Sequence, residues 1–271
     1  MSTAVSVRTF PPVRSASDLF FAQLTDATQR VLLLDYDGTI APFSVHRDRA
    51  YPYPEVARLI ERIMSGCCTR VVFISGRLAR EIPLLLGLDP HPEIWGTYGS
   101  ERLYPDGRYE LAHVGDDVEH AMAEADAWLQ EEGLDGLAEM KPGAVAIHWR
   151  GLDSRHVEEV KAKAYRVLSP LAFQANLLLA EFDGGLELRI RNRSKADAVN
   201  TILSEIGDQP VAYLGDDRTD EDAFRALRER GLTVLVRPTY RFTAAQVWLR
   251  PPDELVQFLT GWIRACGGEC E

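Results

Sequence analysis

Two aspartates, Asp35 and Asp37, follow directly on a continuous apolar run and lead into a glycine turn. Residues 31–39 read Val-Leu-Leu-Leu-Asp-Tyr-Asp-Gly-Thr. Ionisable groups at the end of a buried strand cost free energy unless a cation or a substrate uses them. The pattern therefore predicts a binding site for a cation or a polar substrate, although a strand followed by an ordinary Asp-Gly turn has the same signature.

Three further groups of polar residues stand at comparable positions. Ser75 follows an apolar run of four residues, Lys195 opens a helical segment, and Asp216, Asp217 and Asp220 follow another apolar run. Each has an ordinary explanation alone, as a turn or helix cap, a solvated helix residue, or acidic residues that favour a helix start. Their shared placement past strands and at helix starts favours a single site.

Hydrophobic patterning predicts the elements that position these residues. Unbroken apolar runs end just before Asp35, Ser75 and Asp216. Strands without alternation are typical of a parallel sheet that helices cover on both faces, and such sheets bind ligands outside the carboxyl ends of their strands. Helical spacing recurs at residues 56–63 and 194–206. The predicted fold class is α/β, with a Rossmann-like parallel-sheet core.

The pattern changes between residues 102 and 190. Hairpin signatures at Pro105-Asp106-Gly107 and Asp183-Gly184-Gly185 flank two predicted helices. Strand-rich and hairpin-rich sequence between two β/α halves predicts an inserted α+β cap domain. We therefore expect residues 1–101 and 191–271 to form the catalytic core and residues 102–190 to form the cap.

Composition limits the class of protein further. The 271 residues are 46% hydrophobic, enough for a sizeable core, and the net charge of -11 argues against nucleic acid or an anionic membrane as a main partner. No stretch approaches membrane-spanning length, and the N-terminus lacks a basic region followed by an apolar one. Cys67, Cys68, Cys266 and Cys270 have no zinc-site spacing. We expect a soluble, cytoplasmic monomer with reduced thiols.

Taken together, the motifs carry a resemblance to a known superfamily. Asp-Tyr-Asp-Gly-Thr at 35–39, Ser-Gly-Arg at 75–77, the lysine at 195 and Gly-Asp-Asp-Arg-Thr-Asp-Glu-Asp at 215–222 look like the four motifs of the haloacid-dehalogenase superfamily. The last motif, with its following Ala-Phe, resembles the trehalose-6-phosphate phosphatase family in particular, as does Asp-Tyr-Asp-Gly-Thr-Ile-Ala-Pro at the first. The resemblance implies the haloacid-dehalogenase fold and a phosphatase activity on a sugar phosphate.

The resemblance also implies catalytic roles. Asp35 matches the nucleophile that forms an aspartyl-phosphate. Asp37 matches the general acid and base, which protonates the leaving oxygen and then deprotonates the attacking water. Ser75 and Lys195 complete the catalytic set, since a hydroxyl can grip phosphoryl oxygens and an ammonium supplies a point cation.

The implied cofactor is Mg²⁺, because a hard cation prefers oxygen ligands. Asp35, Asp37 through its backbone carbonyl, Asp216 and Asp217 are the predicted metal residues. Asp217 and Asp220 would hold metal-bound water or orient the catalytic lysine.

Substrate selection is expected in the cap. Lys-Pro at 141–142 and Ile-His-Trp-Arg at 147–150 look like the lysine and His-aromatic-Arg segment of the family, and Leu-Glu-Leu-Arg at 186–189 resembles its Glu-x-Arg-Pro segment. Sugar hydroxyls both donate and accept hydrogen bonds, which suits such residues, although an exposed strand face alternates in the same way. The predicted substrate-binding set is Gly76, Arg77, Glu101, Lys141, His148, Arg150 and Glu187.

Three departures from the family pattern bear on the substrate. Tyr98 stands where the family commonly has histidine, Ile190 where it has proline, and Ala196 where it has glycine. The leading hypothesis is Mg²⁺-dependent hydrolysis of trehalose 6-phosphate, and the alternative is a phosphatase of another glycosyl or amino-sugar phosphate. A signalling receiver domain has a similar acidic set, but Asp37 and the inserted segment count against it.

Overall fold

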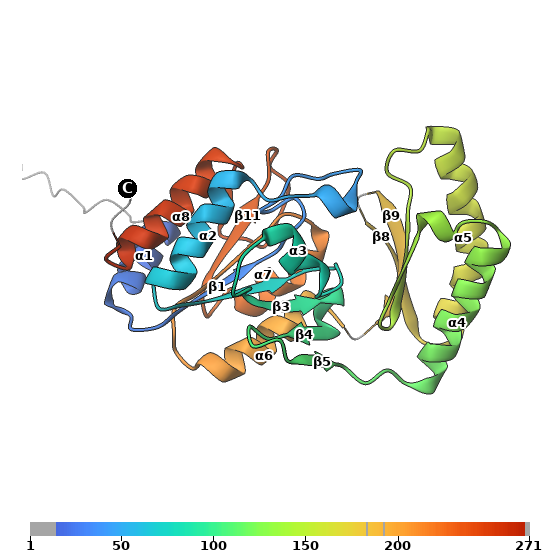
Figure 1. The fold of residues 1–271 in the computed structure, drawn as a ribbon, viewed down its shortest axis with the longest axis horizontal. Coiled ribbons are helices and arrows are strands. Elements are labelled where there is room, and N and C mark those ends of the chain that lie inside the picture. Colours follow the sequence, from blue (N-terminus) through green and yellow to red (C-terminus); the bar gives the residue numbers. More distant parts are fainter. Residues whose placement is uncertain (1–14, 183, 192, 269–271) are drawn as a thin grey trace, which may run out of the picture.

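The computed structural model describes residues 15–182, 184–191 and 193–268. Within these residues the strands form two sheets, and the smaller one lies across from the strand ends of the larger one, as Figure 1 shows. The large sheet has eight strands, in the spatial order β12 (Val247–Leu249), β11 (Leu232–Val236), β10 (Val211–Gly215), β1 (Arg30–Leu34), β2 (Thr69–Ile74), β3 (Glu93–Gly96), β4 (Glu101–Leu103) and β5 (Tyr109–Leu111).

Strand β1 lies in the middle of the large sheet and is buried along its whole length. It pairs in parallel with β10 on one side and β2 on the other, so that Leu33 stands beside both Tyr213 and Val72. The chain continues from β1 towards β3 and later returns on the other side towards β12. The carboxyl end of β1 is therefore the point where the strand order reverses, which is where ligands bind in such sheets. The α/β prediction is confirmed.

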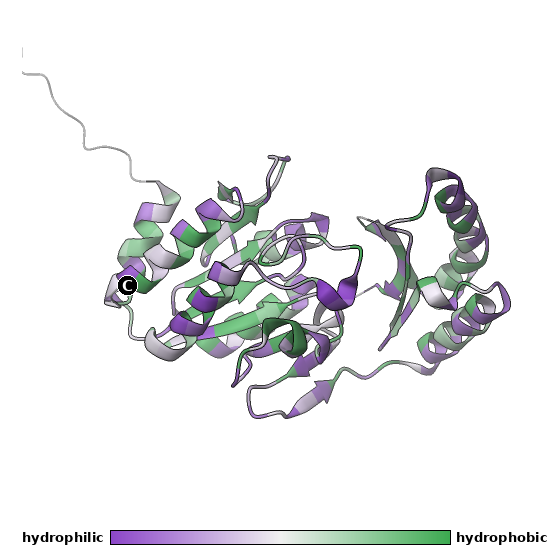
Figure 2. Ribbon diagram, turned by 45° about the horizontal axis from the view of Figure 1, so that its top comes forward, coloured by the Kyte–Doolittle hydropathy of each residue, from purple (hydrophilic) through white to green (hydrophobic). Residues whose placement is uncertain are grey.

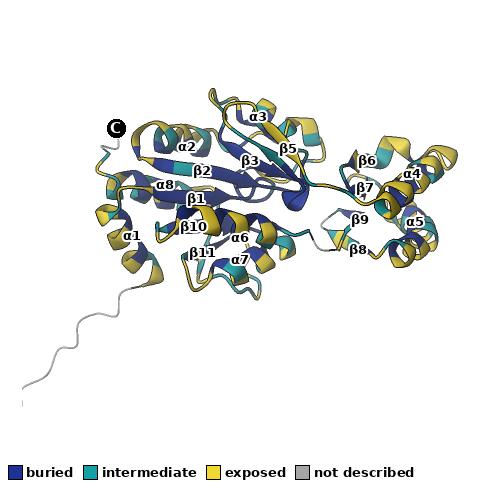
Figure 3. Ribbon diagram, turned by 90° about the horizontal axis from the view of Figure 1, so that it is seen from below, coloured by how far each residue is buried: buried dark blue, intermediate teal, exposed yellow. Residues whose placement is uncertain are grey.

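Helices cover both faces of this sheet. On one face pack α1 (Ala16–Asp26), α2 (Pro54–Gly66), α3 (Glu81–Leu86) and α8 (Asp253–Ala265), and on the other α6 (Lys195–Ile206) and α7 (Glu221–Leu227). Alternate residues of β1 serve the two cores, with Leu32 and Leu34 on the first face and Val31 and Leu33 on the second. Each such side chain contributes about 1.5–3 kcal/mol by leaving water. Figure 3 shows the buried strands between exposed outer helix surfaces.

The hairpin expected at the start of the cap belongs to the large sheet instead. Strand β4 pairs antiparallel with β3, and β5 pairs with β4 around Gly107, whose φ is +83°. The short helix η2 (Thr97–Gly99) reverses the chain at once, because Thr97 and Tyr98 both adopt positive φ. The returning strand therefore pairs with its predecessor, so this hairpin extends the large sheet beyond residue 102.

The second sheet, with its two helices, forms what we call the inserted layer. Its antiparallel strands are β6 (Ala138–Lys141), β7 (Ala144–His148), β9 (Gly185–Ile190) and β8 (Leu177–Phe182), and its helices are α4 (Asp116–Glu131) and α5 (Ser154–Gln174). Val145, Ile147, Leu186 and Leu188 pack against the helices. Because strand residues alternate between faces, the intervening polar residues face the large sheet. Figure 2 shows the strands of the large sheet as mainly hydrophobic and the outer faces of α4 and α5 as hydrophilic.

Both connections to the inserted layer leave the rest of the molecule beside η2. On the way in, Ala112 N–H donates to the Ser100 carbonyl at 2.8 Å. On the way back, the Ser194 carbonyl oxygen lies 3.5 Å from where a Cβ would stand on Gly99. The two crossing points are thus neighbours in space although they are far apart in sequence.

Two expectations from composition concern thiols and membranes. Cys67, Cys68 and Cys266 are free thiols, and Cys270 lies outside the described residues. Among the helices that the structure describes, none combines the length and apolarity that crossing a bilayer would need.

Candidate active site

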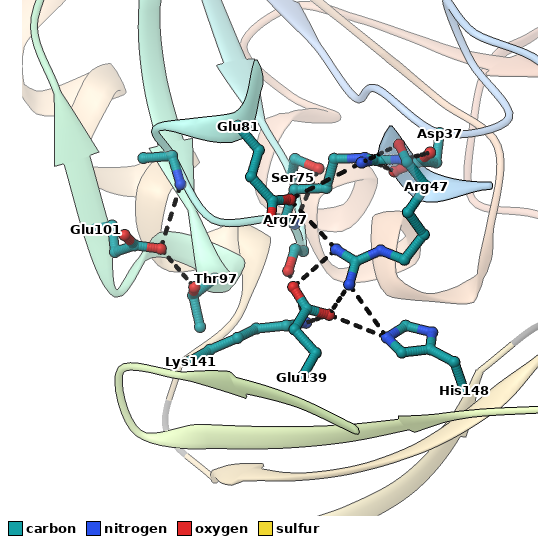
Figure 4. A network of polar contacts seen from close by, with 12 residues as sticks. Asp37, Arg47, Ser75, Arg77, Glu81, Thr97, Glu101, Glu139, Lys141 and His148 are labelled. Carbon is teal, nitrogen blue, oxygen red and sulfur yellow. Dashed lines mark hydrogen bonds and ion pairs between the residues drawn. The ribbon is translucent and has the colours of Figure 1, made fainter. Parts of the chain in front are cut away.

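A pocket lies between the carboxyl ends of β1, β2 and β10 and the polar face of the inserted layer. It brings together every predicted site residue except Glu101, and Figure 4 shows part of the network around it. The predicted residues that line it are Asp35, Asp37, Ser75, Gly76, Arg77, Lys141, His148, Arg150, Glu187, Lys195, Asp216 and Asp217.

Asp35 and Lys195 form the buried centre of the pocket. Lys195 Nζ donates to Asp35 Oδ1 at 2.5 Å and to Asp220 Oδ1 at 2.7 Å, and Thr39 Oγ1 donates to Asp35 Oδ2 at 3.0 Å. Burial raises the pKa of Asp35 to about 7, against the opposing charge of Lys195. Burial would lower the pKa of Lys195, but the charges of Asp220 and Asp35 hold it above its ordinary value. Burial therefore disfavours the ionised form of Asp35, and added positive charge would favour it.

Asp216 completes an acidic cluster with Asp35 and Asp220, whose carboxylate oxygens lie within 4.8 Å of one another. Asp216 is 2% exposed, and its Oδ2 is a buried oxygen without a hydrogen-bond partner among the described residues. Burial, followed by the charges of Asp35 and Asp220, holds the pKa of Asp216 well above its usual range. A buried acceptor without a donor is costly, and a cation would satisfy it.

Asp220 is already occupied by donors. Its carboxylate accepts from the N–H groups of Asp216 and Asp217, each at 2.9 Å, and from Tyr213 Oη at 2.6 Å, besides Lys195. It therefore shapes the loop after β10, and Asp216 is the member of the cluster whose Oδ2 accepts no hydrogen bond among the described residues. The carboxylate of Asp217 accepts from Thr219 N–H and caps the short helix η4 (Arg218–Asp220). The structure thus places Asp220, rather than the predicted Asp217, in the acidic cluster.

Gly38 makes the close approach of this loop possible. Its φ is +83°, and a Cβ at this position would stand 2.3 Å from Asp216 Oδ2. Any side chain would therefore displace the Asp216 carboxylate, besides being strained at that φ. The glycine after Asp37 is a requirement of the site.

Asp37 is held by Arg77 through two hydrogen bonds. Arg77 Nε donates to Asp37 Oδ2 at 2.6 Å and Nη2 donates to Oδ1 at 2.7 Å, a bidentate geometry that fixes the carboxylate plane. Ser75 Oγ accepts from the Arg77 N–H at 3.2 Å. Arg77, predicted to contact substrate, therefore acts on Asp37 in this structure.

The polar face of the inserted layer follows its strand register. Glu139, Ala146 and Glu187 are paired across β6, β7 and β9, so the fully buried Ala146 separates two carboxylates on one face of the sheet. Lys141 Nζ donates to Glu187 Oε1 at 2.8 Å and to the Gly76 carbonyl at 2.9 Å. Burial would lower the pKa of Lys141, but the charges of Glu187 and Glu139 raise it. This end of the pocket offers both donors and acceptors.

Aromatic rings form the apolar walls of the pocket. The ring of His148 meets Phe182 edge-on at 5.3 Å, and the guanidinium of Arg150 lies 4.9 Å from the centre of the Phe43 ring. Tyr98 also lines the pocket, with its ring against Gly76, where a Cβ would come within 2.8 Å of it. The residue that departs from the family pattern at position 98 thus faces the site.

Glu101 is the predicted residue that the structure keeps away from the pocket. It is 1% exposed, and its carboxylate accepts from Thr97 Oγ1 at 2.6 Å, Tyr109 Oη at 2.8 Å and Ala79 N–H at 3.3 Å. The hairpin of β4 and β5 brings Tyr109 over it. Glu101 joins η2 to the turn before α3 and to β5, outside the lining of the pocket.

Two charged residues that line the pocket, Glu139 and Arg47, were not predicted from the sequence. Glu139 stands two residues before Lys141 on the same strand, and the period of two would have placed it on the same face. Arg47 lies in an irregular loop, where no periodicity indicates the direction of a side chain.

Solved structures show the class of fold. A haloacid dehalogenase-like hydrolase from Bacteroides thetaiotaomicron matches with a TM-score of 0.60 at 15% identity, covering 86% of this chain and 99% of that one. The C-terminal domain of C. albicans trehalose-6-phosphate phosphatase matches with a TM-score of 0.73 at 19% identity, covering 97% of this chain and 100% of that one. The fold is that of the haloacid-dehalogenase superfamily of hydrolases, as its motifs predicted.

Sequence comparison narrows this class to one family. The family described as trehalose-phosphatase matches residues 33–246. A protein of Arabidopsis thaliana named "Probable trehalose-phosphate phosphatase H" is 30% identical over 90% of this chain and 75% of its own length. The chain belongs to the trehalose-phosphatase family and is a phosphoric monoester hydrolase.

Proposed function

We propose that this chain is a Mg²⁺-dependent phosphatase that releases phosphate from trehalose 6-phosphate through a phosphorylated Asp35. The observation that carries the proposal is the meeting of Asp35, Asp37, Lys195 and Asp216 in one pocket. The inserted layer closes that pocket with carboxylates and amines, the groups that bind sugar hydroxyls. In this proposal residues 112–190 act as the cap, and the hairpin before them stays with the core.

The surroundings of Asp35 support its role as the nucleophile. A phosphate dianion repels an anionic carboxylate, and Lys195, at 2.5 Å from Asp35 Oδ1, supplies positive charge where the phosphoryl group would lie. In the first step a carboxylate oxygen of Asp35 bonds to phosphorus, the ester bond breaks, and Asp37 gives its proton to the sugar oxygen. In the second step Asp37 takes a proton from water as the water attacks phosphorus, which frees phosphate and restores Asp35.

The geometry around Asp37 supports its double role. Both carboxylate oxygens of Asp37 are fixed by Arg77, while the side chain stays 31% exposed on the pocket side. A fixed acid is ready for proton transfer without losing orientation entropy in the transition state. Its place two residues after Asp35 in a tight turn puts both groups at the same end of β1.

The donor set of the pocket fits Mg²⁺. Asp35 and Asp216 would hold it with the backbone carbonyl of Asp37. The buried Asp216 Oδ2, which accepts no hydrogen bond among the described residues and has Arg237 Nη1 at 3.6 Å, would gain a closer partner. When bound, Mg²⁺ would neutralise phosphate charge and keep Asp35 ionised. Asp220 and Asp217 would act from behind by shaping the loop and capping η4.

The polar row on the inserted layer supports a sugar as the leaving group. Glu139 and Glu187 flank Ala146, and Lys141 bridges Glu187 to the core. Burial alone would raise the pKa of Glu139, but the hydrogen bond from His148 and the charges of Lys141 and Arg47 lower it to about 2. Glu139 is therefore a permanent acceptor for sugar hydroxyls near neutral pH.

Another glycosyl phosphate is the second candidate substrate. Tyr98 lines the pocket where the family commonly has histidine, and Arg189 lies 4.7 Å from the centre of its ring. A phenol ring in this place changes the shape and the donors offered to the sugar. A substrate screen separates the two candidates.

The test is phosphate release from trehalose 6-phosphate, other sugar phosphates and para-nitrophenyl phosphate, with MgCl₂ or with EDTA. We expect the highest kcat/KM for trehalose 6-phosphate, and we expect EDTA to abolish turnover until MgCl₂ is restored. Asp35→Asn should abolish release without changing the melting temperature greatly, whereas Asp208→Asn, at a fully exposed position, should behave as wild type. Turnover by Asp35→Asn would disprove the nucleophile, and equal kcat/KM for all sugars would disprove the substrate.

A further inference from the structure

Arg47 connects the two layers beside the pocket. It begins the short helix η1 (Arg47–Arg49), in the loop between β1 and α2, and its side chain reaches β6 and β7 of the inserted layer, as Figure 4 shows. Arg47 Nη2 donates to Glu139 Oε1 at 2.7 Å, Nη1 pairs with the other oxygen of Glu139, and Nη1 lies 3.3 Å from His148 Nε2. A side chain of the core thus holds both oxygens of a carboxylate in the inserted layer.

The same residue is fastened within its own layer. Arg47 Nη2 donates to Glu81 Oε2 of α3 at 3.3 Å, and the Arg47 carbonyl accepts from Arg77 Nη1 at 2.9 Å. Arg77 in turn holds Asp37 by two hydrogen bonds. A continuous chain of contacts therefore runs from Glu139 through Arg47 and Arg77 to Asp37.

This contact is sheltered enough to be strong. The side chain of Arg47 is 30% exposed and that of Glu139 is 10% exposed. Charge-assisted hydrogen bonds with bidentate geometry are stronger than neutral ones and fix orientation. Glu139 also keeps Lys141 at 3.4 Å and His148 at 3.0 Å, so it would remain paired if Arg47 were removed. Removing Arg47 should therefore turn the carboxylate rather than unfold the layer.

We propose that Arg47 is a positioning residue for substrate selection: it joins the inserted layer to the core through Glu139 and aims that carboxylate at the sugar end of the pocket. The inference rests on the proposed sugar-phosphate function and deepens it. Glu139 pairs with Ala146 in the sheet, and Glu139 lies across the pocket from Asp35. A small aryl phosphate has no sugar to meet Glu139, so Arg47 should matter far less for it.

Arg49 provides a matched control. It lies two residues later in the same short helix, its side chain is 71% exposed, and it pairs with Asp48 at 3.8 Å. Arg49→Met makes the same chemical change in η1 as Arg47→Met, including the loss of one positive charge, but it leaves the contacts of Glu139 unchanged. Any effect that appears in Arg47→Met and is absent from Arg49→Met belongs to the bridge.

The first measurement is steady-state kinetics with trehalose 6-phosphate and para-nitrophenyl phosphate at saturating Mg²⁺. Loss of a charge-assisted contact predicts that Arg47→Met raises KM for trehalose 6-phosphate about tenfold or more, with a much smaller change for para-nitrophenyl phosphate. Arg47→Lys should fall between, because an ammonium cannot hold both oxygens of Glu139 in one plane. The double variant Arg47→Met with Glu139→Gln should be no worse than the poorer single variant. Equal losses on both substrates, or additive losses in the double variant, would overturn the proposal.

The second measurement does not depend on the substrate. Hydrogen exchange followed by mass spectrometry should show faster exchange in β6 and in residues 47–51 of Arg47→Met, and rates like wild type in Arg49→Met. If Arg47→Met leaves the exchange rate of β6 unchanged, the proposal that Arg47 joins the two layers is wrong. If wild type shows no preference for trehalose 6-phosphate, the proposed function fails, and the exchange result alone then decides whether Arg47 joins the layers.

Discussion

Replacing Asp216 with asparagine should make the metal-free protein more stable. Asp216 is 2% exposed, and its Oδ2 is without a hydrogen-bond partner among the described residues, close to Asp35 and Asp220. Leaving such a group unsatisfied costs about 1–3 kcal/mol. Asparagine has nearly the same shape, carries no charge, and its amide can donate to the neighbouring carboxylates. For a chain of this length each kcal/mol shifts the melting temperature by about 2–4 °C, so Asp216→Asn should melt about 2–12 °C higher in EDTA.

The same substitution should remove the response to metal. A ligand at a hundred times its dissociation constant stabilises the folded protein by about 2.7 kcal/mol, and wild type should gain a shift of this order with MgCl₂. Asp216→Asn loses a charged ligand and should gain little. The assay is thermal unfolding in EDTA and across a MgCl₂ titration, with Asp208→Asn as the control because Asp208 is fully exposed.

Two outcomes would refute this reasoning. If Asp216→Asn melts below wild type in EDTA, the ion pair of Asp216 Oδ2 with Arg237 Nη1 at 3.6 Å outweighs the missing hydrogen bond. If Asp216→Asn keeps the full MgCl₂ shift, the cation is held elsewhere.

Three further predictions follow from the same contacts. Burial raises the pKa of Asp35 from 3.8 to about 7, so the folded protein holds this proton more tightly than the unfolded chain does. The metal-free protein should therefore lose stability as pH rises through about 7. Melting temperatures in EDTA between pH 5 and pH 8 measure this, and a melting temperature that rises with pH would contradict it. Ala146→Leu should push Glu139 and Glu187 apart, because Ala146 is fully buried between them, and raise KM for trehalose 6-phosphate far more than for para-nitrophenyl phosphate, which the kinetics of both substrates test. Arg77→Lys should lower kcat by about tenfold or more, since an ammonium cannot hold both oxygens of Asp37; unchanged kcat in single-turnover measurements would show that Asp37 needs no such support.

Local patterns in the chain predicted that Asp35, Lys195 and Asp216 would lie together, and the structure brings them into one pocket. The apolar run before Asp35 indicates a strand buried on both faces, and the ends of parallel strands meet at one edge of a sheet. This geometric rule is enough to bring Asp35, Lys195 and Asp216 together, because each stands at the end of a strand or the start of a helix. The distances and the unsatisfied oxygen of Asp216 depend on packing, which no spacing encodes.

The errors lie where pairing partners decide the outcome. Glu101 has the residue type and the motif position of a sugar-binding group, but the hairpin places Tyr109 over it and fixes it to Thr97. The hairpin itself pairs with β3 because η2 reverses the chain within three residues. Arg47 could not be found from the sequence because its loop has no period to set a direction.

The neighbouring crossing points beside η2 have a consequence for how such proteins diversify. The chain enters the inserted layer at Ala112 and returns from it at Ser194, and both points lie next to Gly99 and Ser100. The inserted layer is therefore attached to the core at a single place. A gene rearrangement could therefore replace the inserted layer with another domain without disturbing the strands of the large sheet. Arg47 belongs to the core, so each replacement domain would have to provide a partner for its side chain.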